Sequence, residues 1–181
     1  MEKTSKKIFT PQNTGFTLIE TLLYISIITI MISSLIPFAW NIIGSSTKSS
    51  TAQEVSSAAR YVSEKIKYEI RNASGIDAAN SNFGLNLSSN PSYKITLLNP
   101  SGSTVFTVQN GKVLIASGGP GAALNSTDTR VDDLTFTNYS SSDGKTKHIG
   151  FTMTISLINP SQRSEFKNTI SLRTSSEVRS N

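Results

Sequence analysis

The feature that most constrains this chain is a long apolar run near its N-terminus. From Phe16 to Ile43 the sequence carries one charged side chain, Glu20, whereas the residues after Thr47 are polar with only short apolar alternations. As a helix the run would be about 42 Å long, which exceeds the roughly 30 Å thickness of a hydrocarbon core. We therefore expect a membrane-spanning helix over residues 16–44, an amphipathic helix over 45–74 and a β-rich head over 75–181.

The residues that flank the run predict its orientation in a membrane. Lys3, Lys6 and Lys7 precede the run, and Trp40 lies near its far end. Basic residues mark the cytoplasmic side of a span and tryptophan favours an interface. We expect a single-pass protein of the cytoplasmic membrane, in contact with lipid, with its N-terminus in the cytoplasm and its C-terminal domain outside.

The composition argues against several other classes of protein. The formal charge of +5 is spread along the chain and forms no basic stripe, so nucleic-acid binding has little electrostatic support. The chain has no cysteine, which excludes a disulfide framework and thiolate metal sites.

Two ordinary explanations of the apolar run leave Glu20 unexplained. A cleaved secretory signal could use the small residues 44–46 as its site, but the run is longer than a usual signal core and contains an acid. A plain membrane anchor fits by length. An acid at mid-helix costs about 2.5–3.5 kcal/mol on insertion scales, less near the interface, where Glu20 could reach the headgroups.

The residues around Glu20 offer a third explanation. The segment GFTLIE places Gly15 after a short basic leader, Phe16 next, an acid four positions further on, and then the apolar helix. Over residues 1 to about 44 this closely resembles the prepilin signature of type IV pilins and type II secretion pseudopilins. The resemblance implies that a prepilin peptidase removes residues 1–15 as a leader, cutting between Gly15 and Phe16, and that the new amino group of Phe16 is N-methylated.

The same resemblance implies an assembly role for Glu20, which would neutralise the N-terminal ammonium of a neighbouring subunit. The implied partners are the peptidase, other pilin or pseudopilin subunits and the inner-membrane assembly machinery. Elementary physics agrees, because a glycine before the cut lets a protease approach the backbone closely. Cleavage would also create a positive charge one helical turn from Glu20, and in a low dielectric a paired acid is far less costly than an unpaired one.

Two further residues of the run bear on its flexibility. Pro37 lies inside the expected helix, where a proline removes one hydrogen bond and kinks the chain, and Gly44 follows it. The resemblance to pilins implies that the helix can unwind between these two positions, so we expect a kink over Pro37–Gly44.

The rest of the chain predicts an α+β, pilin-like fold in which the long helix packs on an antiparallel β-sheet. Asn110-Gly111 between two apolar runs predicts a hairpin, and residues 75–92 and 117–129 are expected loops. Period-two alternation predicts strands near 93–97, 134–136, 149–157 and 170–172. Apolar residues at spacings of three and four predict the packed helix face. They are Val55, Ala59, Val62, Ile66, Ile70 and Ala73.

Acids and the sole histidine are the candidates for chemistry. Asp132 and Asp133, with Asp128 nearby, could bind Ca²⁺, but their spacing matches no EF-hand loop and a polar strand entry explains them equally well. His148 precedes the best strand and is expected to be an exposed turn residue. We therefore expect no cofactor, with calcium as the alternative, and no enzymatic activity.

Other motifs are weaker still. The glycines of 118–121 lack a following GK[ST] and predict a flexible loop instead of a phosphate cradle. Asn125 and Asn138 begin glycosylation sequons, which arise by chance in a chain rich in serine and threonine.

The leading hypothesis is a structural subunit of a type IV pilus, a type II secretion pseudopilus or a competence filament. The segments KIKYEIRNASGI, VDDLTF and SLRTSSE resemble minor pilins or minor pseudopilins, and the C-terminal cysteine pair of many major pilins is absent. The alternative is a membrane-anchored extracytoplasmic binding protein that uses the helix only as a tether.

Overall fold

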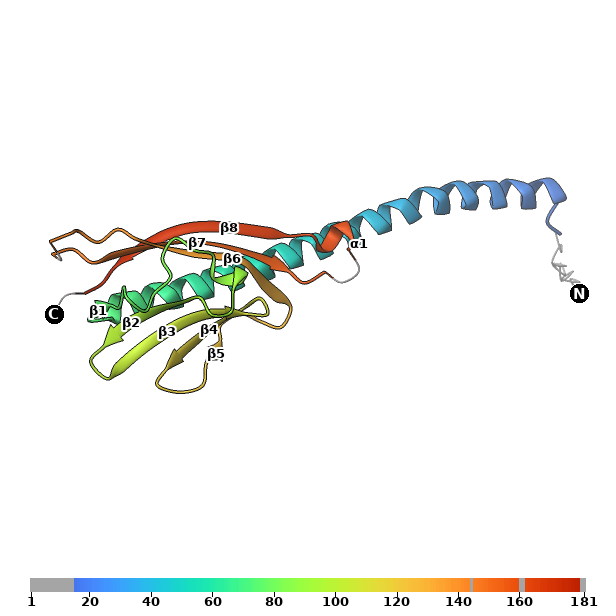
Figure 1. The fold of residues 1–181 in the computed structure, drawn as a ribbon. Helices are drawn as coiled ribbons and strands as arrows, with labels where there is room; N and C mark the ends of the chain where they lie inside the picture. The colour runs from blue at the N-terminus through green and yellow to red at the C-terminus, as the bar shows by residue number, and fades with distance from the viewer. Residues whose placement is uncertain (1–14, 144, 160–161, 180–181) are drawn as a thin grey trace, which may run out of the picture. The chain divides into compact units, whose positions relative to one another are not determined.

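The computed structural model describes residues 15–143, 145–159 and 162–179. The chain divides into two compact units, residues 1–43 and 44–181, and each is described by itself. Helix α1 (Leu18–Asn72) contributes to both units. The remaining elements, coloured in chain order in Figure 1, are β1 (Gly75–Ile76), the 3₁₀ turn η1 (Leu87–Ser89), β2 (Lys94–Asn99), β3 (Gly102–Gln109), β4 (Lys112–Ser117), β5 (Ala122–Ala123), β6 (Thr129–Asn138), β7 (His148–Leu157), η2 (Ser164–Phe166) and β8 (Thr169–Glu177).

The strands of the second unit form two antiparallel sheets alongside the second part of α1 (Figure 1). The first sheet has the order β1-β2-β3-β4-β5 and the second has the order β6-β7-β8. The α+β fold class is therefore confirmed, with two sheets where the sequence suggested one. Alternation along a strand reports which side chains are buried, but it does not report which strands are neighbours.

The β3–β4 hairpin confirms the prediction from its turn residues. Gln109 pairs with Lys112, and the two residues between them, Asn110 and Gly111, have φ of 51° and 73°. These left-handed conformations define the two-residue turn that matches the twist of paired strands, which is why Asn-Gly favours it.

One face of α1 packs into the core as the helical period predicts. The six apolar residues predicted for this face are each at most 1% exposed. In the same buried cluster the two sheets meet through aromatic rings. Phe106 of β3 lies 6.1 Å from Phe136 of β6 between ring centroids, and Phe136 lies 5.5 Å from Phe151 of β7. Aromatic pairs of this kind contribute about 0.5–1.5 kcal/mol each beyond the area they bury.

The two expected loops contain more structure than the sequence indicated. Residues 75–92 include β1 and η1, and Leu87 of η1 is fully buried. Residues 117–129 include β5 and the buried Asn125. The prediction of an exposed turn at His148 was wrong, because His148 is the half-buried first residue of β7 and pairs with Glu177. Short polar segments gave no period from which these contacts could be read.

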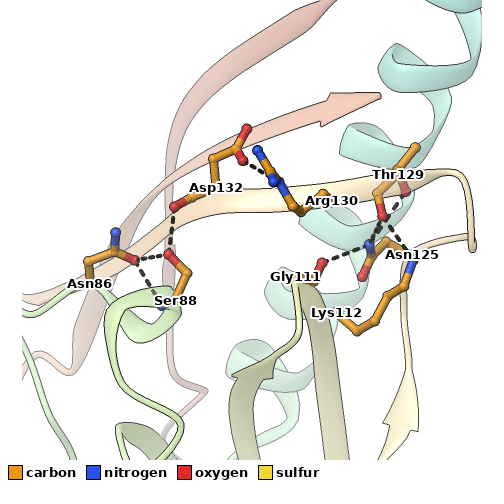
Figure 2. Close-up of polar contacts among 8 residues, drawn as sticks. All are labelled: Asn86, Ser88, Gly111, Lys112, Asn125, Thr129, Arg130 and Asp132. Atoms are coloured by element: carbon orange, nitrogen blue, oxygen red, sulfur yellow. Dashed lines mark hydrogen bonds and ion pairs between the residues drawn. The ribbon is translucent and has the colours of Figure 1, made fainter. Parts of the chain in front are cut away.

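A buried asparagine joins the two sheets where β5 leads into β6 (Figure 2). The Asn125 side chain accepts a hydrogen bond from the Val113 amide at 2.9 Å and donates to the carbonyls of Gly111 at 3.1 Å and Thr129 at 2.8 Å. The Lys112 ammonium also donates to the Thr129 carbonyl, at 2.9 Å. Strand β5 pairs with β4 only at Leu114 and Ile115, and the Asn125 side chain supplies a hydrogen-bond partner for the next residue of β4, Val113.

A second asparagine fixes η1 to β6, also in Figure 2. The Asn86 side-chain oxygen accepts from the amides of Ser88 at 2.9 Å and Leu134 at 3.1 Å. The Ser88 hydroxyl donates to the carbonyl of Asp132 at 2.5 Å. These bonds occupy the outer edge of β6 and connect residues far apart in the sequence.

Candidate functional site: the apolar helix and its first turn

The first unit presents an apolar surface that nothing within the described residues covers. The large hydrophobic side chains from Phe16 to Ile43 are all exposed, including Leu18 at 79% and Ile30 at 71%. The most apolar window of α1 has a mean hydropathy of 2.2 and is not buried in the protein. The helix is long and apolar enough to cross a membrane.

Four hydroxyl groups of this segment are paired in a way that is compatible with hydrocarbon. An unpaired hydroxyl in an apolar medium costs several kcal/mol, and a bond to a helix carbonyl one turn back removes that cost. Four hydroxyls make such bonds: Thr21 to Thr17 at 3.2 Å, Ser26 to Leu22 at 2.8 Å, Thr29 to Ile25 at 2.7 Å and Ser34 to Met31 at 3.1 Å.

The start of the helix is defined by Thr17. Residues 15–17 are not helical, and the first helical residue is Leu18. The Thr17 hydroxyl accepts a hydrogen bond from the Glu20 amide at 3.3 Å, and the Thr17 carbonyl accepts from the Thr21 amide at 3.1 Å. Thr17 is therefore the N-cap and Glu20 is the third helical residue, the spacing of a capping box.

This geometry provides a second physical reason for an acid at position 20, one that the sequence did not lead us to predict. Glu20 lies in the first turn of α1, where the partial positive charge of the helix dipole favours a carboxylate. Its side chain is half-buried, unlike its apolar neighbours. The signal was present in the sequence as Thr17-x-x-Glu20 ahead of an apolar run, the ordinary signature of a helix start.

The expected cleavage residues and the expected kink have different environments. Gly15 and Phe16 are exposed and precede the helix, and the Phe16 ring lies edge-on to Tyr24 with centroids 6.2 Å apart. Pro37 and Gly44 both lie within the continuous helical span of α1. The kink over Pro37–Gly44 stays a prediction. Residues 1–14 of the expected leader 1–15 lie outside the described residues.

Two of the three aspartates that suggested calcium, Asp132 and Asp133, accept hydrogen bonds from side chains of this protein. Arg130 donates from Nε to Asp132 at 2.8 Å, and the Thr135 hydroxyl donates to Asp133 at 2.8 Å. Asp132 itself is left out of the pairing with β7, because the register of β6 shifts between Val131 and Asp133. In the part of the chain that the structure describes, no three His, Cys, Asp or Glu side chains gather where they could hold a metal ion.

The two sequon asparagines differ in accessibility. Asn125 is 6% exposed and its amide is hydrogen-bonded on both sides. Asn138 is exposed at the end of β6, and its side-chain oxygen accepts from the Ser140 amide at 3.0 Å. In the folded head, only Asn138 of this pair presents its side chain to solvent.

No family model, curated protein or solved structure matches this chain.

Proposed function

We propose that the chain is a structural subunit of the pilin or pseudopilin type. In this proposal it inserts with its N-terminus in the cytoplasm, loses residues 1–15 by cleavage between Gly15 and Phe16, is N-methylated on Phe16, and assembles through its apolar helix. The observation that supports it is Glu20, the one charged side chain between Phe16 and Ile43, which lies in the first turn of α1, four residues after Phe16, at the start of an exposed apolar surface.

Two physical requirements favour assembly through the helix. A continuous apolar surface of this size must be covered by lipid or by other apolar helices, because exposing it to water is costly. A carboxylate on that surface needs a cationic partner in hydrocarbon, and a free amino group at Phe16 of a neighbouring subunit would supply one. The filament is a type IV pilus, a type II secretion pseudopilus or a competence filament, with this chain as a minor subunit.

Processing is tested by intact mass and N-terminal analysis of the protein extracted from membranes. We expect a chain that begins at N-methylated Phe16. An unprocessed Met1 start in cells with an active prepilin peptidase would refute the proposal. A start at Thr47 would instead indicate ordinary signal cleavage.

Assembly is tested by replacing the acid. We expect Glu20→Ala to insert and to be cleaved at the wild-type site, yet to be absent from filaments. Glu20→Gln is the matched control, because glutamine keeps the shape and the capping ability but removes the charge. If Glu20→Gln enters filaments normally, the proposed ion pair with a neighbouring subunit is refuted and the acid only caps the helix. A tethered binding protein would keep its function in both variants.

A further inference from the structure

The peptide bond that the proposed function requires to be cut lies outside the helix. Gly15, Phe16 and Thr17 are non-helical and exposed, and helical backbone begins one residue later. Exposed, irregular segments are where proteases cut, because a helical bond must first be unwound to enter an active site. The position of the helix start therefore decides whether the Gly15–Phe16 bond is accessible.

One hydroxyl group marks that start. The Thr17 side chain accepts from the Glu20 amide, one of the amides at a helix N-terminus that have no partner within the helix. The sequence contains competing caps, since Asn13 and Thr14 are also residue types that favour an N-cap. A helix that started from either of them would include Gly15 and Phe16 in its first turn.

We propose that Thr17 is a positioning residue for leader removal, which keeps the cut bond in non-helical backbone by fixing the helix start at Leu18. This inference rests on the proposed function, because it concerns the same cleavage. It assigns Thr17 no contact with the protease. The residue acts through the backbone of Gly15 and Phe16.

The experiment uses the full-length chain in membranes with an active prepilin peptidase and follows the rate of leader removal. Thr17→Val removes only the hydroxyl and keeps the branched shape, and Thr17→Ser restores the hydroxyl. Thr21→Val is the matched control, because its hydroxyl bonds the Thr17 carbonyl at 3.2 Å and caps no amide. We expect Thr17→Val to be cut about fivefold more slowly, the ratio that corresponds to about 1 kcal/mol for an N-cap. Thr17→Ser and Thr21→Val should stay within about twofold of wild type, a range worth only a few tenths of a kcal/mol.

A second readout separates the cap from a general effect of substitution. Amide hydrogen exchange in detergent micelles reports where the helix starts, and we expect the Leu18 and Ile19 amides to become slower to exchange in Thr17→Val as the helix extends. Wild-type cleavage of Thr17→Val with an unchanged exchange pattern would overturn the inference and leave the proposed function standing. Slow cleavage of both Thr17→Val and Thr17→Ser would also overturn the inference, because the serine hydroxyl should restore the wild-type rate. Failure of the wild-type chain to be cut would refute the proposed function itself.

Discussion

Replacing Asn125 by alanine should destabilise the head more than its small size suggests. The side chain makes three hydrogen bonds that join β4, the 124–129 segment and the start of β6. Figure 2 shows the two that it donates, to the carbonyls of Gly111 and Thr129. Two of the partners keep another bond, because the Gly111 carbonyl accepts from the Val131 amide at 2.9 Å and the Thr129 carbonyl accepts from Lys112. Among the described residues, the Val113 amide has no acceptor other than the Asn125 side-chain oxygen.

The magnitude follows from that difference. Val113 is fully buried, so its orphaned amide costs about 1–3 kcal/mol, and each of the two weakened acceptors adds about 0.5 kcal/mol. We expect Asn125→Ala to lower the free energy of unfolding by about 2–4 kcal/mol, a large part of the roughly 5–15 kcal/mol that holds a domain together.

The assay is urea unfolding of the full chain in micelles followed by pulse proteolysis, because the single tryptophan, Trp40, lies in the apolar helix and does not report on the head. Amide exchange at Val113 provides a local check. Asn138→Ala is the control, since this exposed asparagine makes one bond to Ser140 and should change stability by at most about 0.5 kcal/mol. Equal losses in the two variants, or an unchanged Val113 exchange rate, would refute the reasoning.

Two glycines give further predictions. Gly111→Ala should lower the free energy of unfolding by at least about 1–2 kcal/mol, because its φ is +73° and a Cβ would lie 2.3 Å from Cγ of Arg130; chemical denaturation measures this. Gly150→Ala should displace the Tyr139 ring, whose Cε2 would lie 2.6 Å from the new Cβ. The hydrogen bond from Arg173 to the Tyr139 hydroxyl holds the tyrosine pKa below its usual value, so the variant should raise that pKa, as alkaline titration by NMR would detect.

Each of these predictions has its own control. Gly84 also has a positive φ, of 76°, but a Cβ there would meet open space. Gly84→Ala should therefore lower the free energy of unfolding by less than Gly111→Ala does. Similar costs would show that the contact with Arg130 is unimportant. Arg173→Gln should raise the Tyr139 pKa as Gly150→Ala does. In wild type the lowered pKa means that ionisation of Tyr139 begins at a lower pH than for an ordinary tyrosine, and coincident titrations in all three proteins would contradict the proposed geometry.

The sequence predicted those elements whose cause is local. The packed face of α1 and the strand β7 follow from period, because burial of every third or fourth residue in a helix and every second in a strand is set by backbone geometry. The Asn110-Gly111 hairpin follows from the two left-handed conformations that such a turn requires. The apolar run and its single acid predicted a helix long enough to span a membrane without reference to any other part of the chain.

Only the tertiary structure decided how the strands divide into two sheets and which polar side chains join them. Asn86 bonds the Leu134 amide across 48 positions of sequence, and Asn125 bonds the Val113 amide across 12. In the sequence both asparagines lie in polar segments that look like ordinary loops, because hydrogen-bond partners at such distances leave no periodic signal. Thr17 and Glu20 stand between these cases, since their spacing is a local signature of a helix start and the hydroxyl–amide bond locates that start. The difference is therefore one of distance along the chain. Backbone geometry acts between near neighbours and produces a periodic sequence pattern. The hydrogen-bond partners of buried polar groups depend instead on which distant segments the core brings together.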